Sequence, residues 1–192
     1  MIFSHKKATL SWRAICQYTW SSANWKKIPY AIHVESDTYV DVNRWSYIFS
    51  QEIIIQTEAT RRGWFGCAQQ QTRGLVLRKG KAAADSLMYE YNYYPTYCAG
   101  SCYGMTREVI DRLLAQVSQT RFYYLDNIYL TGILRRKASL KPPTPIHNGP
   151  LMCQHLADLR FLAKRFQIEY KSTTVDELIR EAHQKKFELV AQ

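Results

Sequence analysis

The sequence predicts one α/β domain, a mixed sheet flanked by helices, and two observations lead to that prediction. Short apolar runs typical of buried strands alternate along the chain with segments whose apolar residues recur at helical spacing. The chain also contains no internal repeat and no linker long enough to separate two domains. Its 192 residues are enough for a sizeable core, so residues 1–192 are expected to form a single domain.

The clearest strand signal in the first half of the chain is the apolar run at residues 28–34. We expect it to be a buried central strand that ends at the polar triplet 35–37. Apolar residues at helical spacing predict a helix before it, at residues 8–20. The other elements expected in this half are an extended segment at 38–40, a helix at 43–51, and strands at 64–68 and 74–77.

The most regular helix of the second half follows Thr106, whose hydroxyl suits the N-cap of a helix at residues 106–117. The remaining elements expected in this half are a helix at 128–136, an extended proline-rich break at 141–145, a segment at 151–166 that fits a helix or a strand, and a last helix from the capping box at 174–177 through 187.

The net charge of +10 favours anionic partners. The basic residues are scattered, however, and no zinc-finger or RNA-binding signature accompanies them, so nucleic acid is not an expected partner. The 14 tyrosines suit surfaces that stack on flat or ring-shaped ligands. No apolar run is long enough to span a bilayer, and the first residues do not form a signal peptide.

The cysteines do not predict a structural zinc site, because no two of them form a C-x-x-C pair. Cys98 and Cys102 are spaced in a way that fits a metal or redox pair only weakly. An odd number of cysteines leaves at least one thiol free or paired outside the chain, and the redox compartment stays open. The five are Cys16, Cys67, Cys98, Cys102 and Cys153.

The acidic triplet Glu35-Ser36-Asp37 predicts a metal site. It lies at the end of an apolar strand, where open α/β sheets place their ligands. Glu35 and Asp37 offer two carboxylates that can share Mn²⁺ or Mg²⁺ through hard oxygen ligands. Such a cation neutralises a diphosphate leaving group.

An aromatic loop at residues 93–104 is expected to wall a ligand pocket. Its glycines allow close backbone approach, and a helix follows it at once. A tightly packed loop without a ligand is the alternative that the loop alone leaves open. The residues expected to contact that ligand are Tyr94, Pro95, Tyr97, Gly100 and Tyr103.

Three blocks of the chain resemble glycosyltransferase family 31, which contains the β-1,3-galactosyltransferases and β-1,3-N-acetylglucosaminyltransferases. IHVESDTYVD at 32–41 looks like the family's strand with three consecutive aspartates, and YPTYCAG at 94–100 like its Tyr-Pro-Pro-Tyr-Cys-Ser-Gly loop. LDNIYLTG at 125–132 looks like its Glu-Asp-Val motif followed by glycine. Trp12 and Cys16 also match a family helix. Order and separation agree across the blocks, and the resemblance runs over residues 8–134.

The resemblance implies a GT-A-like nucleotide-sugar-binding fold and an inverting, metal-dependent transfer of a sugar. The donor would be a UDP-sugar, the acceptor a glycan hydroxyl, and the product a β-1,3 linkage in protein glycosylation. The family implies a Golgi membrane enzyme facing the lumen, held by an anchor that these residues do not include. The match begins near the middle of the family's domain, so a partial domain without the first strands is expected.

Two departures from the family pattern bear on catalysis. Glu35 and Ser36 replace two aspartates of the acidic triplet, so metal binding depends on Glu35 and Asp37. Asn127 occupies the position of the family's general base and cannot accept a proton at neutral pH. Either the adjacent Asp126 has taken over that task, or the site is catalytically weakened; the family register favours the second outcome. A looser match places Lys171 where many members carry a metal-binding histidine.

Three functions are therefore weighed. The first is a UDP-sugar-dependent hexosyltransferase. The second is a non-catalytic carbohydrate- or nucleotide-binding relative or inactive fragment, which Asn127 favours. The third, a basic nucleic-acid-binding module, is supported only by charge and tyrosine content.

Overall fold

The structure, a computed structural model, describes residues 10–25, 27–35, 38–60, 63–80, 83–99, 102–146 and 153–155, with main chain only at 52–60 and 154–155. In chain order the elements are helix α2 (Leu10–Asn24), strands β1 (Tyr30–Val34) and β2 (Thr38–Val40), helix α3 (Val42–Thr60), strands β3 (Phe65–Cys67), β4 (Gln70–Gln71), β5 (Tyr97–Cys98) and β6 (Cys102–Thr106), helix α4 (Arg107–Leu114), a 3₁₀ turn (Val117–Gln119), helix α5 (Asp126–Ile128), a π-helical segment (Tyr129–Leu134), helix α6 (Arg135–Lys137), and strands β7 (Thr144–Pro145) and β8 (Cys153–His155).

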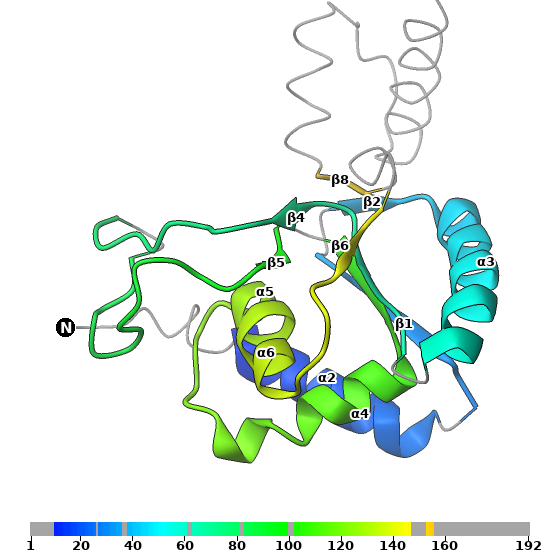
Figure 1. Cartoon of the computed structure of the whole chain (residues 1–192), viewed down its shortest axis with the longest axis horizontal. Coiled ribbons are helices and arrows are strands. Elements are labelled where there is room, and N and C mark those ends of the chain that lie inside the picture. The colour runs from blue at the N-terminus through cyan, green and yellow to red at the C-terminus, as the bar shows by residue number, and fades with distance from the viewer. Residues whose placement is uncertain are drawn as a thin grey trace, which may run out of the picture.

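A mixed four-stranded sheet in the order β1-β6-β3-β7 forms the centre of the fold. Its β1–β6 and β6–β3 pairs are antiparallel, and β3–β7 is parallel. Two small antiparallel sheets, β2–β8 and β4–β5, extend it. Helix α3 covers one face, and α2, α4, α5 and α6 lie on the other (Figure 1). The predicted mixed sheet flanked by helices is confirmed.

One strand prediction is wrong and another holds only in part. Among the described strands β1 lies at an edge of the sheet; its first four side chains are half-buried rather than buried, and Val34 is exposed. Residues 74–77 form no strand; Leu75 makes only a single bridge, to Tyr93. The guanidinium of Arg78, which follows this segment, instead donates hydrogen bonds to the carbonyls of Ala84, Tyr89 and Tyr91 in the next loop.

The face of the sheet under α3 is aromatic. Trp45 and Phe49 of α3 and Trp64, which precedes β3, are buried together. Gly104 of β6 makes this packing possible, because a Cβ there would lie 2.5 Å from the ring of Trp45 and 2.7 Å from that of Phe49. A glycine in the strand therefore allows two rings to rest directly on the backbone.

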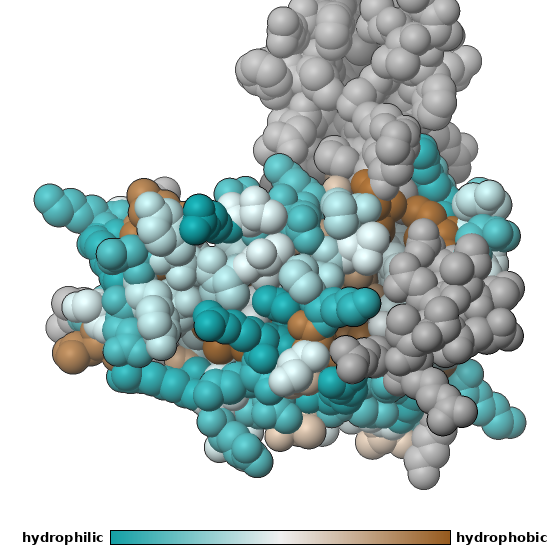
Figure 2. Space-filling model, viewed as in Figure 1, coloured by the Kyte–Doolittle hydropathy of each residue, from teal (hydrophilic) through white to brown (hydrophobic). Residues whose placement is uncertain are grey.

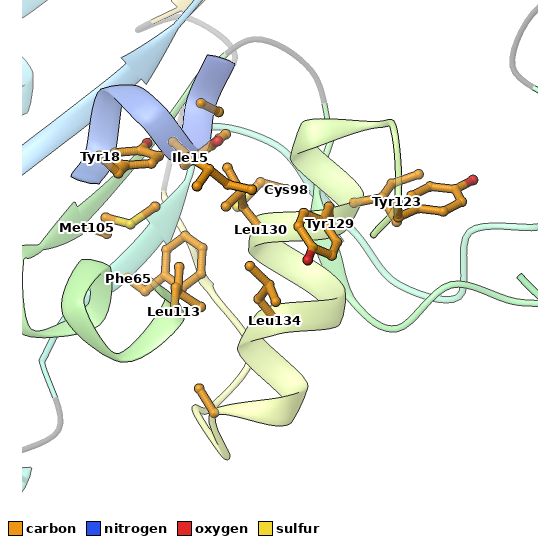
Figure 3. Packing of buried hydrophobic residues seen from close by; sticks show 14 of the residues in the cluster. Ile15, Tyr18, Phe65, Cys98, Met105, Leu113, Tyr123, Tyr129, Leu130 and Leu134 are labelled. Atoms are coloured by element: carbon orange, nitrogen blue, oxygen red, sulfur yellow. The ribbon is translucent and has the colours of Figure 1, made fainter. Parts of the chain in front are cut away.

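The opposite face carries the larger core (Figure 3). Phe65, Tyr103 and Met105 project from the sheet toward Val109 and Leu113 of α4. Because side chains alternate between the two faces along each strand, the residues next to these in sequence point to the other face, toward α3. Ile15 and Tyr18 of α2 and the π-helical residues Tyr129, Leu130 and Leu134 complete this core.

Thr106 occupies the predicted N-cap position of α4 with an extended backbone, but its side chain makes no capping bond. Its Oγ1 accepts the backbone N–H of Trp64 at 3.0 Å instead. The helix runs from Arg107 to Leu114, slightly shorter than predicted. The hydroxyl therefore joins the helix start to the adjacent strand.

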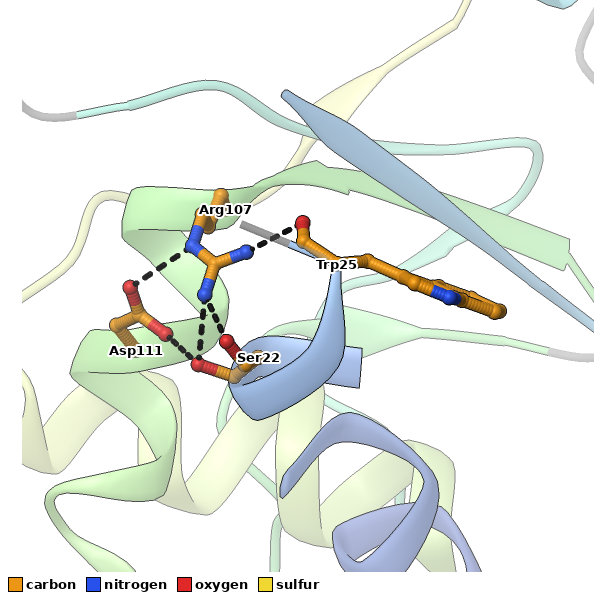
Figure 4. A network of polar contacts seen from close by, with 4 residues as sticks. All are labelled: Ser22, Trp25, Arg107 and Asp111. Carbon is orange, nitrogen blue, oxygen red and sulfur yellow. Dashed lines mark hydrogen bonds and ion pairs between the residues drawn. The ribbon is translucent and has the colours of Figure 1, made fainter. Parts of the chain in front are cut away.

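Arg107 ties the end of α2 to the start of α4 (Figure 4). Its guanidinium donates to the carbonyl of Trp25 at 2.7 Å and to the carbonyl of Ser22. Asp111 accepts the Ser22 hydroxyl at 2.5 Å and lies 3.6 Å from Nε of Arg107. A cation at the last carbonyls of a helix is favourable, so this network fixes where α2 ends.

Two disulfides link pairs of strands in the described part of the chain. Cys67 of β3 bonds to Cys98 of β5, and Cys102 of β6 bonds to Cys153 of β8, with Cα–Cα distances of 5.4 and 6.0 Å. Cys98 and Cys102 thus have separate partners, so the metal or redox pairing considered for them is wrong. Cys16 is the free thiol, as an odd count requires.

The surface view shows hydrophilic side chains over most of the described face, with small apolar areas between them (Figure 2). Within the described ranges, no helix is long and apolar enough to cross a membrane. The segment at 151–166 lies outside the described residues except for β8, and the predicted C-terminal helix lies wholly outside them.

Candidate functional site

A cleft of about 530 Å³ lies where α2, the end of β1 and the start of α5 meet. Both signs of charge meet in it: one guanidinium, one imidazole and two carboxylates. The described residues that line the cleft are Leu10, Arg13, Ala14, Gln17, His33, Val34, Glu35 and Asp126. Polar groups converging in a hollow at a strand end are the usual form of a ligand site in α/β proteins.

The wall formed by α2 follows from helical periodicity. The four α2 residues in the cleft are spaced i, i+3, i+4 and i+7, which places them on one face of the helix. Ala14 is buried in this stripe, whereas Arg13 and Gln17 are exposed at its edge. The same helix therefore packs on the core and presents a cation and an amide to the cleft.

His33 enters the cleft from β1. Alternation along the strand places it on the same face as Ala31, toward the larger core. Its ring stacks on that of Tyr103, its cross-strand partner, with centroids 4.7 Å apart and planes 9° apart. Its Nε2 lies 3.5 Å from Oδ2 of Asp126.

Asp126 begins α5, and its carboxylate is ionised at neutral pH. Burial raises the pKa of this carboxyl, but the hydrogen bond and charge of His33 and the backbone N–H groups of Asn127 and Asp126 outweigh burial and lower the pKa below its ordinary value. The side chain is 23% exposed. A half-buried carboxylate facing a cleft can accept a proton from a bound hydroxyl.

Asn127 directs its side chain elsewhere. Its Oδ1 accepts the backbone N–H of Ile128 at 2.9 Å, and its carbonyl accepts the hydroxyl of Thr131. It is not among the described residues that line the cleft. Of the two candidates for the base, the geometry therefore favours Asp126.

Residues 94–97 of the predicted aromatic loop pack beside α5 and the π-helical segment that follows it. Tyr94 is buried, and its hydroxyl lies 2.5 Å from that of Tyr123. Pro95 and Tyr97 rest on Gly132, where a Cβ would lie 3.2 Å from each. Neither these residues nor Tyr103 are among the described residues that line the cleft.

The contact of Tyr94, Pro95, Tyr97 and Tyr103 with a bound ligand stays a prediction. Gly100 lies outside the described residues. Tyr103 does reach the site indirectly, because its ring supports that of His33.

The predicted metal site is described only in part. Glu35 lines the cleft, and its carboxylate is the hard oxygen donor that fits Mn²⁺ or Mg²⁺. Asp37 and Lys171 lie outside the described residues. Among the residues that are described, no three His, Cys, Asp or Glu side chains are grouped to hold a metal ion.

Sequence reasoning missed His33, Arg13 and Gln17. A signal for His33 was present, because a residue two positions before Glu35 on a strand lies on the same face. The two α2 residues were detectable only as the polar edge of an amphipathic helix, a pattern that most surface helices share.

A model of the galactosyltransferase family matches residues 5–145. This range includes α2, β1, the aromatic loop and Asp126, and so contains every described residue of the cleft. A comparison with curated protein sequences gives no match. The family match covers well over half of the chain and agrees with the mixed α/β architecture, so the chain belongs to the galactosyltransferase family.

Proposed function

We propose that this galactosyltransferase-family chain transfers a hexose from a UDP-sugar to a glycan hydroxyl, with inversion and formation of a β-1,3 linkage. Glycosyl transfer in general follows from the family. The observation that supports the particular reaction most directly is the ionised carboxylate of Asp126 in a cleft that also contains Glu35 and Arg13.

In the proposed reaction Asp126 is the general base. The acceptor oxygen forms a bond to the anomeric carbon of the donor as the bond from that carbon to the diphosphate oxygen breaks. The proton of the acceptor hydroxyl passes to the Asp126 carboxylate, and UDP leaves with the bonding electron pair. A single displacement of this kind inverts the anomeric configuration and needs one carboxylate within hydrogen-bond reach of the acceptor hydroxyl.

Glu35 and Asp37 would hold Mn²⁺ or Mg²⁺, which supplies positive charge to the diphosphate when bound. Arg13 adds a cation on the α2 wall of the same cleft that Glu35, just after β1, lines. Electrostatic stabilisation of a leaving diphosphate is the largest contribution that such a site offers. The roles of Tyr94, Pro95, Tyr97, Gly100 and Tyr103 toward donor or acceptor remain part of this proposal.

A Golgi-type lumen is the proposed compartment, with protein or lipid glycans as acceptors. The family suggests it, and the two disulfides support it, since disulfides persist in oxidising compartments.

Donor binding tests the metal-dependent part of the proposal. Calorimetry with UDP should show binding that needs Mn²⁺, is weakened in Glu35→Ala and is lost in Asp37→Ala, since each change removes an anionic ligand from the cation. Glu90→Ala is the matched control: Glu90 is exposed and is not among the residues that line the cleft, so this variant should bind UDP as the wild type does. Equal UDP affinity in EDTA and in Mn²⁺ would contradict the metal-dependent site.

A non-catalytic sugar- or nucleotide-binding relative is the second candidate, because Asn127 stands at the position of the family's base. It predicts UDP binding without donor hydrolysis or transfer. Turnover by the wild-type protein, lost in Asp126→Asn, would exclude it.

A further inference from the structure

We propose that His33 is a positioning residue, which holds the carboxylate of Asp126 in the orientation that receives the acceptor proton. This inference rests on the proposed function, because it assigns the partner of the proposed base. It begins from one contact, the 3.5 Å between His33 Nε2 and Asp126 Oδ2.

The His33 ring is held in place by its surroundings. Tyr103, fully buried, stacks on one side of it, and Tyr18 lies near it with ring centroids 6.2 Å apart. The β1–β6 register sets His33 directly opposite Tyr103, so backbone pairing and ring stacking fix the same position. The imidazole side chain is only 16% exposed, so neighbouring atoms surround most of it.

The carboxylate of Asp126 has two kinds of partner. Asp126 begins the helical stretch that the π-helical segment and α6 continue to Lys137, and the backbone N–H groups of Asn127 and Asp126 favour its charged form. The imidazole adds a donor on the sheet side, at Oδ2. A carboxylate accepts about four hydrogen bonds, so contact with His33 leaves lone pairs for a hydroxyl in the cleft.

A fixed hydrogen-bond donor next to the Asp126 carboxylate matters because the rate of proton transfer depends on where the base lies. A base must lie within about 2.6–3.2 Å of the hydroxyl, and a displacement of about 1 Å can cost roughly 10²-fold in rate. In this arrangement His33 affects the rate of transfer only through its contact with Asp126. The alternative is a histidine that simply packs on Tyr103 and has no effect on turnover.

Two substitutions separate these roles. His33→Phe keeps an aromatic ring to stack on Tyr103 and removes the donor, whereas His33→Gln keeps an N–H near the position of Nε2 and removes the ring. We expect His33→Phe to lower kcat by roughly 10- to 100-fold with little change in the KM for the UDP-sugar. His33→Gln should recover a large part of the lost kcat.

The double variant His33→Phe/Asp126→Asn completes the test. If His33 acts through Asp126, the double variant should be no slower than Asp126→Asn alone, because the interaction is already lost. Thermal unfolding of each variant shows whether it is folded, and His33→Gln serves as the second readout if His33→Phe is not.

The outcomes distinguish this inference from the proposed function. An active wild type, a slow Asp126→Asn and an unchanged kcat in both His33 variants would overturn the positioning role alone. Additive losses in the double variant would do the same, since they would mean that His33 acts independently of Asp126. An inert wild type, or an Asp126→Asn protein as fast as wild type, would overturn the proposed function and the positioning role together.

Discussion

The hydroxyl of Thr131 accepts the backbone N–H of Cys98 at 2.8 Å. This bond joins the π-helical segment to β5, which lies within the aromatic loop at residues 93–104. The same hydroxyl donates to the carbonyl of Asn127, one turn earlier. Through one buried side chain, the loop is therefore connected to the backbone immediately after Asp126.

Thr131→Val should destabilise the protein and loosen this connection. The substitution keeps the shape of the side chain but leaves the buried N–H of Cys98 without its acceptor, which costs about 1–3 kcal/mol. Thr131→Ser, which keeps the hydroxyl, is the matched control and should lose less. Urea unfolding measures both, and a smaller loss in Thr131→Val than in Thr131→Ser would mean that the methyl group, rather than the hydrogen bond, is what matters.

Arg107→Ala should weaken the attachment of α2 to α4. It removes the charged donor that binds the carbonyls of Ser22 and Trp25 at the end of α2, at a cost of about 1–2 kcal/mol. Since α2 carries Arg13, we also expect weaker UDP binding. The exposed Arg121→Ala is the control, because it removes the same charge elsewhere. A loss of stability in Arg121→Ala as large as in Arg107→Ala would contradict the role of the network.

Stability should fall as the pH rises above about 10, where tyrosines of an unfolded chain ionise. Burial raises the pKa of Tyr18, Tyr103 and Tyr123 in the folded protein, so above a pH of about 10 the folded state holds more protons than the unfolded state. Each such group then lowers the free energy of unfolding by about 1.4 kcal/mol per pH unit. At lower pH these groups have no such effect.

Tyr103→Phe checks this prediction, because it removes one ionisable hydroxyl and keeps the ring. Urea midpoints measured from about pH 8 to about pH 11, on either side of the ordinary tyrosine pKa, should fall less steeply in the variant than in the wild type. Parallel curves would show that Tyr103 ionises as readily in the folded protein as in the unfolded chain.

The sequence predicts the fold well where its signals are local. Periodicity predicted α2 and α4, and the apolar runs predicted β1 and β3. The helix expected at 43–51 is the first half of α3, which continues to Thr60. The edge position of β1 could not be read from its composition, because half-burial between two helical layers needs the same apolar residues as full burial. Strand order depends on pairings between distant residues, which no local pattern records.

Disulfide pairing also lay beyond the sequence. Cys98 and Cys102 are close in the chain but belong to strands β5 and β6, and each bonds to a distant partner. Nothing in the spacing distinguishes these pairings from the others that five cysteines allow.

Two parts of the candidate cleft were noted in the sequence, and their functional roles stay predictions. The acidic strand end and the start of α5 were both identified from the sequence, and Glu35 and Asp126 line one cleft. The choice between Asp126 and Asn127 needed the structure, because a shift of one residue at a helix start turns a side chain by about 100°. The hydrogen bond from the Ile128 N–H to Asn127 holds that side chain away from the cleft lining.

Sugar transfer by Asp126→Asn and Asn127→Asp proteins tests the central claim most directly. Each is measured against wild type with a UDP-sugar and a glycan acceptor in Mn²⁺. We predict that wild type transfers sugar, that Asp126→Asn loses about 10²–10⁴-fold in rate as expected for a lost base, and that Asn127→Asp gives no substantial gain. An inert wild type that becomes active in Asn127→Asp, or an Asp126→Asn protein that keeps the wild-type rate, would contradict the assignment of Asp126 as the base.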